Sequence, residues 1–267
     1  MTAKVAVVTG ASRGIGKQTA LLLADRGYQL VLTARTDQPR AQTPGTLGDT
    51  AEEVTSLGLA PLVIKADLGV QADLENVVAR TLEQLGRVDV LINNAAYTVG
   101  KTLFTHVPDL TRDQWEKHFA INVTAPLMLI QGFWDTMSRS GGGVIINLTS
   151  GASFLREMSS VADYETGLPE NGPAYGASKA ALNRMANVIA QEGLAHGIAV
   201  INLEPGFVLT ETMAATFAAT GVTETRAISL MVPAAAMAFL ATCPDPLEYS
   251  GQIVSAPDLV ARLSLLP

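Results

Sequence analysis

Short, continuously apolar segments alternate along the chain with longer segments in which apolar residues recur at helical spacing. We predict strands at residues 5–9, 30–34, 62–66, 90–93, 144–149, 199–203 and 252–254. Strands that are apolar on both sides are typical of a parallel sheet covered on both faces, and their alternation with helical segments is typical of βαβ units. The pattern therefore predicts an α/β fold with a doubly wound parallel sheet of about seven strands.

Two stretches between these strands have the periodicity of amphipathic helices. The residues that recur at helical spacing are Ile15, Thr19, Leu22, Leu23 and Arg26 in the first stretch, and Ala181, Met185, Val188 and Ile189 in the second. Residues at these intervals share one side of a helix. We expect both helices to pack against the sheet.

The chain has 267 residues, a length that α/β folds often reach within one domain. No change of composition suggests a linker, and no repeat is evident. We therefore predict a single domain over residues 1–267. Irregular stretches at 36–49 and 151–173, and a lid region at 210–230, follow strands. Ligands bind at the carboxyl ends of strands in such folds, so we expect these stretches to border the site.

Charged residues make up 16% of the chain and hydrophobic residues 48%, against a typical charged share of about 25%. This composition excludes a disordered chain, which has low hydrophobicity and high net charge. With so few charges to cover its surface, the chain is expected to bury apolar area against copies of itself. We predict a homo-oligomer.

The formal net charge of −7 would repel nucleic acid and anionic membrane surfaces. The single cysteine, Cys243, cannot form an internal disulfide, and the first residues resemble no signal peptide. These features favour a cytoplasmic protein. The longest uncharged run, 227–244, is interrupted by Pro233 and is shorter than the roughly 20 residues of a membrane span. It is interpreted as a buried helix.

A glycine-rich loop with Gly10, Gly14 and Gly16 lies between the first predicted strand and the first predicted helix. Glycines allow the backbone to approach a pyrophosphate, and the N-terminus of a helix offers free N–H groups to an anion. The position of the loop favours dinucleotide binding over a merely structural turn.

The spacing T-G-x-x-x-G-x-G resembles that of the short-chain dehydrogenase/reductase family. Further matches are the segment N-N-A after the fourth strand and P-G-x-x-x-T after the sixth. The resemblance implies a Rossmann-type fold and a set of residues that contact the cofactor. This set is Gly10, Ser12, Arg13, Gly14, Ile15, Gly16, Arg35, Asp67, Leu68, Asn94, Ala95, Tyr175, Lys179, Pro205, Gly206, Val208 and Thr210.

The end of the second strand indicates which dinucleotide binds. An acidic residue about 20 positions after the glycines holds the ribose 2′-OH of NAD, whereas an arginine accommodates the 2′-phosphate of NADP. Here Ala34 takes the acidic position and Arg35 follows it, with Arg13 in the loop as a second cation. We predict NADP rather than NAD, the alternative being two arginines on a solvated surface.

Tyr175 and Lys179 form the pattern Y-x-x-x-K. Side chains four positions apart on a helix face each other, and an ammonium group favours phenolate, so it lowers a phenol pKa from its ordinary value near 10. Tyr175 is thus expected to act as acid or base near neutral pH. Taken alone, this pair is more often a tyrosine at a helix start beside a surface lysine.

The resemblance to the family completes the catalytic set with Ser150, which would hold the substrate oxygen, and Asn122, which would support proton delivery to Lys179. It implies hydride transfer between a nicotinamide and a small-molecule carbonyl or alcohol, in a homodimer or homotetramer. The alternatives are an NAD-linked secondary-alcohol dehydrogenase and a catalytically idle dinucleotide sensor. The idle sensor has no need of an activated phenol.

Some positions depart from the family pattern or leave their role open. Ala96 replaces the usual glycine of N-N-A-G, and 25 residues separate Ser150 from Tyr175, which indicates an insert. Met213 and Phe217 are either a lid face or ordinary core. Three histidines, His106, His118 and His196, lack metal-ligand spacing. We interpret them as surface or helix-end residues.

Overall fold

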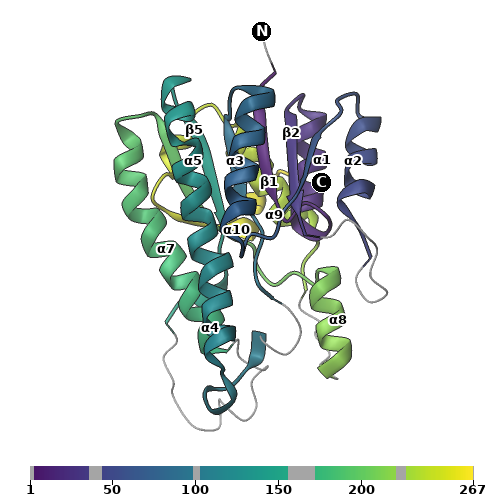
Figure 1. Cartoon of the computed structure of the whole chain (residues 1–267), viewed down its shortest axis with the longest axis vertical. Helices are drawn as coiled ribbons and strands as arrows, with labels where there is room; N and C mark the ends of the chain where they lie inside the picture. Colours follow the sequence, from purple (N-terminus) through teal and green to yellow (C-terminus); the bar gives the residue numbers. More distant parts are fainter. Residues whose placement is uncertain (1–2, 36–43, 99–102, 156–171, 221–226, 267) are drawn as a thin grey trace.

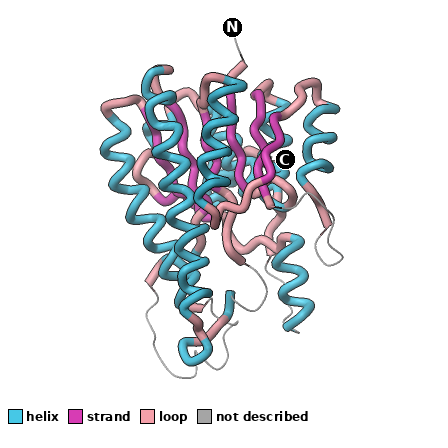
Figure 2. Tube along the Cα trace, viewed as in Figure 1, coloured by secondary structure: helices cyan, strands magenta, loops and turns pink. Residues whose placement is uncertain are grey.

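The computed structural model describes residues 3–35, 44–98, 103–155, 172–220 and 227–266. The described strands form one parallel sheet in the order β3-β2-β1-β4-β5-β6-β7, shown in magenta in Figure 2. They are β1 (Val5–Thr9), β2 (Gln29–Ala34), β3 (Leu62–Lys65), β4 (Val90–Asn93), β5 (Gly143–Leu148), β6 (Ile198–Glu204) and β7 (Ile253–Ser255). The predicted doubly wound sheet is confirmed, and each predicted strand end lies within one residue of the observed end.

Helices cover both faces of the sheet (Figure 1). One layer consists of α3 (Gln71–Leu85), α5 (Ala125–Arg139) and α7 (Pro173–Leu194), and the other of α1 (Gly14–Asp25), α2 (Leu47–Ser56), α9 (Met231–Thr242) and α10 (Ala256–Leu263). The short helix α4 (Arg112–Phe119) leads through a π-helical turn, Ala120–Thr124, into α5. Helix α8 (Glu211–Thr220) lies beyond the carboxyl ends of the strands.

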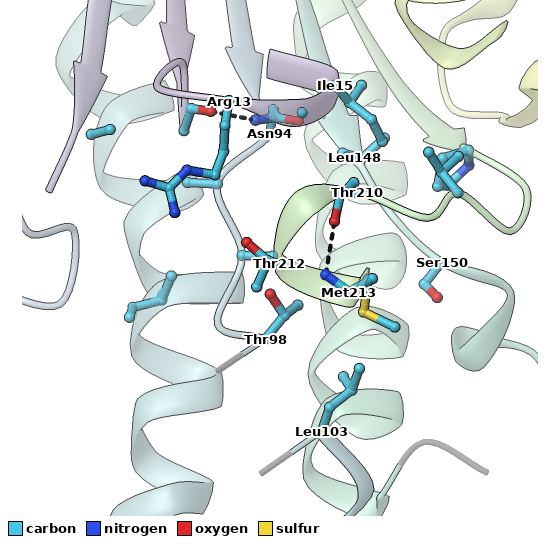
Figure 3. Close-up of a pocket in the computed structure, with 18 of the residues that line it drawn as sticks. Arg13, Ile15, Asn94, Thr98, Leu103, Leu148, Ser150, Thr210, Thr212 and Met213 are labelled. Carbon is cyan, nitrogen blue, oxygen red and sulfur yellow. Dashed lines mark hydrogen bonds between the residues drawn. The ribbon is translucent and has the colours of Figure 1, made fainter. Parts of the chain in front are cut away.

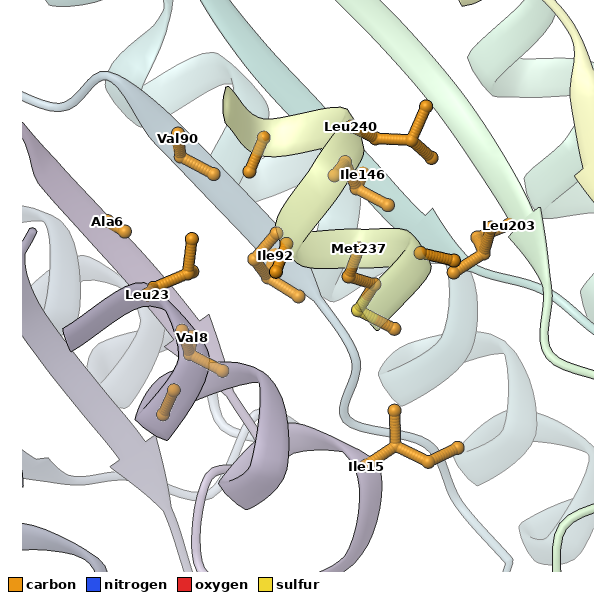
Figure 4. Close-up of a cluster of buried hydrophobic side chains, with 14 of the residues drawn as sticks. Ala6, Val8, Ile15, Leu23, Val90, Ile92, Ile146, Leu203, Met237 and Leu240 are labelled. Carbon is orange, nitrogen blue, oxygen red and sulfur yellow. The ribbon is translucent and has the colours of Figure 1, made fainter. Parts of the chain in front are cut away.

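The strands are apolar on both sides because each face meets a helix layer. Alternate residues such as Val8, Ile92 and Ile146 pack with Met237 and Leu240 of α9 in one cluster (Figure 4). The residues between them point to the opposite face, where the second cluster contains Val7, Leu91, Ile145 and Phe133, all fully buried. Two dry clusters on the two sides of one sheet account for the uncharged strands.

The uncharged run at 227–244 contains α9, in which all residues from Pro233 to Ala238 are buried. The interpretation of this run as a buried helix is therefore confirmed. Across the described residues, no helix combines the length and apolar character needed to cross a membrane.

The prediction that Ala181, Met185, Val188 and Ile189 face the sheet is wrong for Val188, which is exposed, whereas Ile189 packs against the core cluster on this face. The buried side of α7 carries small residues, Ala174, Ser178, Ala186, Ala190 and Gly193, together with Leu182 and Lys179. Val188 is 39% exposed, and the other three are half-buried. Small residues let α7 approach β6 closely, and of the larger apolar side chains Leu182 and Ile189 pack on the core side while Val188 is exposed.

Strand order reverses between β1 and β4, because β2 and β3 lie on one side of β1 while β4 to β7 lie on the other. A crevice forms at such a switch point, outside the carboxyl ends of the strands. The loops after β1 and β4, with Gly10 and Asn94, meet there. This edge of the sheet carries the candidate site.

Candidate active site

A cavity of about 320 Å³ opens at the carboxyl ends of the strands (Figure 3). Most of the predicted site residues line it. They are Gly10, Ser12, Arg13, Gly14, Ile15, Arg35, Asp67, Leu68, Asn94, Ala95, Ser150, Tyr175, Lys179, Pro205, Gly206, Val208 and Thr210. Segments separated by up to 200 residues in the chain thus share one cavity, whereas Gly16 and Asn122 lie behind its wall.

The glycine loop is held closely against the end of β4. The side-chain amide of Asn94 donates to the carbonyl oxygens of Thr9, at 2.8 Å, and Gly10, at 3.3 Å. Gly10 has a φ of +66°, and a Cβ atom there would lie 2.7 Å from Asn94 Nδ2. A Cβ atom on Gly16 would lie 2.5 Å from the Gly10 carbonyl oxygen. Gly16 is therefore required for packing of the loop.

The N-terminus of α1 opens into the cavity at Gly14. No side chain of its own caps this helix, because Arg13 at the N-cap makes no capping hydrogen bond and the first turn contains no acidic residue. Its free N–H groups and dipole form a site for an anion. Residues on α1 and its loop therefore fit the phosphates of a dinucleotide.

Two arginines lie at the end of the cavity formed by β2 and β3. Arg35 Nη1 is 3.9 Å from Asp67 Oδ2, and both side chains are about 40% exposed. Arg13 Nη2 donates to the Gly45 carbonyl oxygen at 2.6 Å. Both arginine side chains line the cavity.

Tyr175, Lys179 and Ser150 meet at the other end. Tyr175 and Lys179 are in the first turns of α7, and the Lys179 ammonium lies 5.9 Å from the centre of the Tyr175 ring. Lys179 Nζ donates to the Leu148 carbonyl oxygen at 2.7 Å, and Lys179 is 2% exposed. Ser150 follows β5 by two residues, and its side chain lies close enough to the Tyr175 hydroxyl to lower the pKa of that group. Tyr175, Lys179 and Ser150 thus line one cavity, and their catalytic role stays a prediction.

The pKa values of the site differ from the expectation that Lys179 lowers the pKa of Tyr175. Burial raises the pKa of Tyr175 above its ordinary value, the Ser150 hydrogen bond lowers it, and the charge of Glu204 raises it further. Burial lowers the pKa of Lys179 to about 7. Desolvation disfavours the charged form of each group, so in the ligand-free protein both are shifted toward the neutral form.

Asn122 lies in the π-helical turn between α4 and α5 and is fully buried. Its Oδ1 accepts from the Tyr97 N–H at 2.8 Å, and its Nδ2 donates to Ser178 Oγ at 2.9 Å. Ser178 is adjacent to Lys179 on α7. Asn122 therefore joins the loop after β4 to the helix that carries the tyrosine and the lysine.

A buried row of asparagines below the site was not predicted. Asn93, Asn147 and Asn202 occupy paired positions on β4, β5 and β6. Asn93 Nδ2 donates to Asn147 Oδ1 at 2.9 Å, and Asn147 Nδ2 donates to Asn202 Oδ1 at 3.2 Å. This row ties together the three strands whose carboxyl ends carry Asn94, Ser150 and Pro205.

A second polar contact also escaped prediction. Asn183 Nδ2 on α7 donates to Ser153 Oγ at 2.8 Å, and Ser153 Oγ donates to the Ser150 carbonyl oxygen at 2.7 Å. These bonds fix the turn after Ser150 against α7. An isolated serine or asparagine in a loop carries no sequence signal that could have identified them.

Leu103, Phe207, Met213 and Thr98 also line the cavity, and Figure 3 shows Leu103, Met213 and Thr98 among the labelled side chains around it. Met213 is on α8, whose first turn is capped by a bond from the Met213 N–H to Thr210 Oγ1 at 3.2 Å. Met213 thus lines the cavity, and a lid role for it stays a prediction. Phe217 is instead buried, with its ring 6.1 Å from Phe104 and 5.8 Å from Phe207. Most of the predicted insert, and residues 221–226 of the predicted lid, lie outside the described residues.

The histidines have different environments. His106 and His196 are exposed, but His118, at the end of α4, is fully buried beside the rings of Tyr97 and Tyr175, at centroid distances of 5.0 and 6.0 Å. The described part of the chain contains no group of three or more His, Cys, Asp or Glu residues arranged to hold a metal ion.

Comparison with known proteins agrees with this geometry. The family model described as short chain dehydrogenase matches residues 4–221. The uncharacterized oxidoreductase YohF of Escherichia coli K12 is 34% identical over 209 residues, which is 78% of this chain and 74% of YohF. The chain belongs to the short-chain dehydrogenase family and is an oxidoreductase of that family.

Two further relatives differ in their cofactors. The NAD-dependent glycerol dehydrogenase of Listeria innocua is 31% identical over 79% of this chain and 73% of its own length. A metagenomic short-chain oxidoreductase solved in complex with NADP has a TM-score of 0.73 and 28% identity, covering 94% of this chain and 96% of its own. The family uses NAD or NADP, and membership alone does not select between them.

Proposed function

We propose that this protein is an NADP(H)-dependent carbonyl reductase or alcohol dehydrogenase that uses Tyr175 as its acid and base. The observation that carries the proposal is one cavity lined by Arg13 and Arg35, which follow β1 and β2, and by Ser150, which follows β5 on the other side of β4, with Tyr175 and Lys179. An extended dinucleotide has its charged adenosine phosphate at one end and its reactive ring at the other. The distribution of these side chains matches that polarity.

The residues present fit such a cofactor. The uncapped N-terminus of α1 would hold the pyrophosphate, and Arg35 with Arg13 would hold the 2′-phosphate. Asp67 and Leu68 would border the adenine, while Asn94, Ala95 and the segment from Pro205 to Thr210 would enclose the nicotinamide half. When bound, the nicotinamide supplies the hydride.

The chain's own residues would position the substrate and move the proton. Ser150 would donate a hydrogen bond to the substrate oxygen and so stabilise the charge that develops there. Tyr175 would give its hydroxyl proton to the new alcohol, or take it in the reverse direction. Lys179 would bind the nicotinamide ribose and, in its charged form, favour phenolate. Asn122 would support delivery of protons toward Lys179.

The raised pKa of Tyr175 in the ligand-free chain suits a proton donor for reduction. The positive charge of an oxidised nicotinamide would favour phenolate and so prepare Tyr175 for the oxidation direction. The apolar side chains of Leu103, Phe207 and Met213 at the substrate end favour a substrate with an apolar body. We further propose one catalytic domain over residues 1–267, a homodimer or homotetramer, and a cytoplasmic location.

Two alternatives remain open to experiment. An NAD-linked secondary-alcohol dehydrogenase is supported by the glycerol dehydrogenase relative and opposed by Arg35. A catalytically idle dinucleotide sensor is opposed by the assembled Ser150, Tyr175 and Lys179, which binding alone does not require.

The test is NADPH and NADH consumption with a panel of aldehydes, ketones and 3-oxo compounds. We expect NADPH to be consumed with at least one apolar ketone or 3-oxo ester, and NADH much more slowly. A faster reaction with NADH supports the NAD-linked enzyme, and tight NADPH binding without turnover of any compound supports the sensor.

A further inference from the structure

The carboxylate of Glu211 lies at the N-terminus of α1, although 197 residues separate it from Gly14 along the chain. Glu211 Oε1 accepts a long hydrogen bond of 3.4 Å from the Gly14 N–H. A Cβ atom on Gly14 would lie 3.4 Å from the other carboxylate oxygen, Oε2. The carboxylate thus contacts the phosphate-binding loop at the wall of the cavity.

Elementary electrostatics explains this position. The first turn of α1 contains no acidic residue, and Arg13 makes no side-chain cap, so its positive dipole end has no local counter charge. Glu211 is the first residue of α8 and therefore also lies in that helix's own first turn. One carboxylate serves the N-termini of two helices.

The contact is nevertheless weak. At 3.4 Å the hydrogen bond is longer than the 2.7–3.2 Å usual for N–H to oxygen. Glu211 Oε2 is buried and has no hydrogen-bond partner among the described residues. A buried carboxylate oxygen without a donor is poorly solvated. The carboxylate can therefore be displaced by a ligand that uses the same N–H groups.

A dinucleotide pyrophosphate is such a ligand, since it binds the free N–H groups at a helix N-terminus. It has the same sign of charge as Glu211. The two anions cannot both have the best contact with the start of α1. Because Glu211 begins α8, its displacement would also move the helix that carries Met213 at the substrate end.

We propose that Glu211 is an affinity-setting residue that competes with the cofactor pyrophosphate for the N-terminus of α1. This role rests on the proposed function, because it requires that the cavity bind a dinucleotide. The Glu211 carboxylate makes one long hydrogen bond with the first N–H group of α1, which the pyrophosphate would also use. Cofactor binding displaces the carboxylate, so part of the binding energy is used to move α8.

The proposal predicts two effects of opposite sign in Glu211→Gln, which keeps the shape of the side chain and removes its charge. NADPH, titrated by its own fluorescence, should bind about 5- to 30-fold tighter, as expected when a competing charge is removed. The melting temperature of the cofactor-free protein should fall by about 1–4 °C because α1 loses its acidic partner. Glu211→Ala should shift both quantities in the same directions.

Two controls isolate the competition. Glu52→Gln changes the net charge equally at an exposed position on α2 and should leave NADPH affinity within about twofold. Adenosine 2′-monophosphate lacks the pyrophosphate, so its inhibition constant against NADPH binding should be equal in the wild type and in Glu211→Gln.

The outcomes separate this role from the proposed function. Unchanged or weaker NADPH binding by both Glu211 variants overturns the competition while leaving the reductase intact. An equally large increase in the affinity for adenosine 2′-monophosphate also overturns the competition. The removed charge would then affect any anion in the cavity and not the pyrophosphate in particular. If neither NADPH nor NADH binds the wild-type protein, the proposed function fails, and the competition fails with it.

Discussion

The ammonium group of Lys179 donates to the carbonyl oxygen of Leu148 at 2.7 Å. The bond joins the start of α7, which carries Tyr175, to the end of β5, two residues before Ser150. Burial lowers the pKa of Lys179 to about 7. Lys179 must be charged to favour the phenolate form of Tyr175. The burial that positions Lys179 also brings its pKa close to neutral pH.

Replacement of this lysine should change how stability depends on pH. The pKa of Lys179 is about 7 in the folded chain, against an ordinary 10.5. Between these values the unfolded chain binds a proton that the folded chain releases, so stability rises with pH. Below pH 7 Lys179 is charged in both states, so the folded chain carries the full cost of burying the ammonium group. Above pH 10.5 the lysine is neutral in both states, and this cost is absent.

Lys179→Met removes this titration. When the pH is raised from 6 to 9, the free energy of unfolding of the wild type should increase by about 1–4 kcal/mol more than that of the variant. Urea unfolding at three pH values measures the difference. Lys4→Met, at an exposed position, should give a curve parallel to the wild type. A parallel curve for Lys179→Met would contradict the assigned pKa.

Tyr175→Phe tests the proton transfer. The change removes the hydroxyl whose pKa Ser150 lowers and leaves the ring beside His118. Turnover of the best ketone should fall by about 10²- to 10⁴-fold, the usual contribution of a positioned acid, while NADPH affinity stays within a few fold. Tyr249→Phe is the matched control. Undiminished turnover in Tyr175→Phe would remove Tyr175 from the mechanism.

The strands and the order of the site motifs could be predicted from the sequence because both depend on local patterns. Val5–Thr9 and the central strands beside it are mostly apolar, since helices cover both faces there. Gly10 and Gly14 are prescribed by the turn itself, which requires positive φ at both positions. Tyr175 and Lys179 are four residues apart, so the helix alone brings them together.

The remaining features depend on contacts that no local pattern records. Val188 of α7 was mistaken for a buried residue because mostly small residues face β6. Asn147 lies in an otherwise apolar strand, and only the register with β4 and β6 shows its partners. Glu211 and Gly14 meet only after the whole sheet has formed.

Arg35→Asp should reverse the cofactor preference. Arg35 lies 3.9 Å from Asp67, so the substitution both removes a cation and adds a second carboxylate beside the proposed 2′-phosphate position. A charge-assisted hydrogen bond contributes about 1.5–3 kcal/mol, and added repulsion strengthens discrimination. The ratio of kcat/KM for NADPH to that for NADH should fall by about 100-fold or more. The control Arg26→Asp, at an exposed position, should leave this ratio unchanged. If Arg35→Asp has the same ratio as the wild type, Arg35 does not belong to the 2′-phosphate site.

Asn147→Leu should destabilise the sheet beneath the site. The leucine has nearly the same shape but leaves Asn93 Nδ2 and Asn202 Oδ1 without the partners that they have at 2.9 and 3.2 Å. Unpaired buried polar groups cost about 1–3 kcal/mol each, so we expect a loss of about 2–4 kcal/mol in urea unfolding. Asn76→Leu, on the exposed side of α3, provides the control. An unchanged unfolding midpoint in Asn147→Leu would show that the row adds no stability.

The outward apolar side of α7 gives the proposed oligomer a specific interface. Val188 is 39% exposed, and Met185 on the same helix is half-buried. A second copy of the chain would cover this side, because apolar area gains free energy when it leaves water. Light scattering at micromolar concentration should therefore show more than one chain per particle in the wild type. Val188→Glu should reduce that mass, since an unpaired charge at an interface is costly to bury, whereas Thr55→Glu on α2 should not. A wild-type particle of one chain would disprove the oligomer, and a Val188→Glu particle of unchanged mass would place the interface elsewhere.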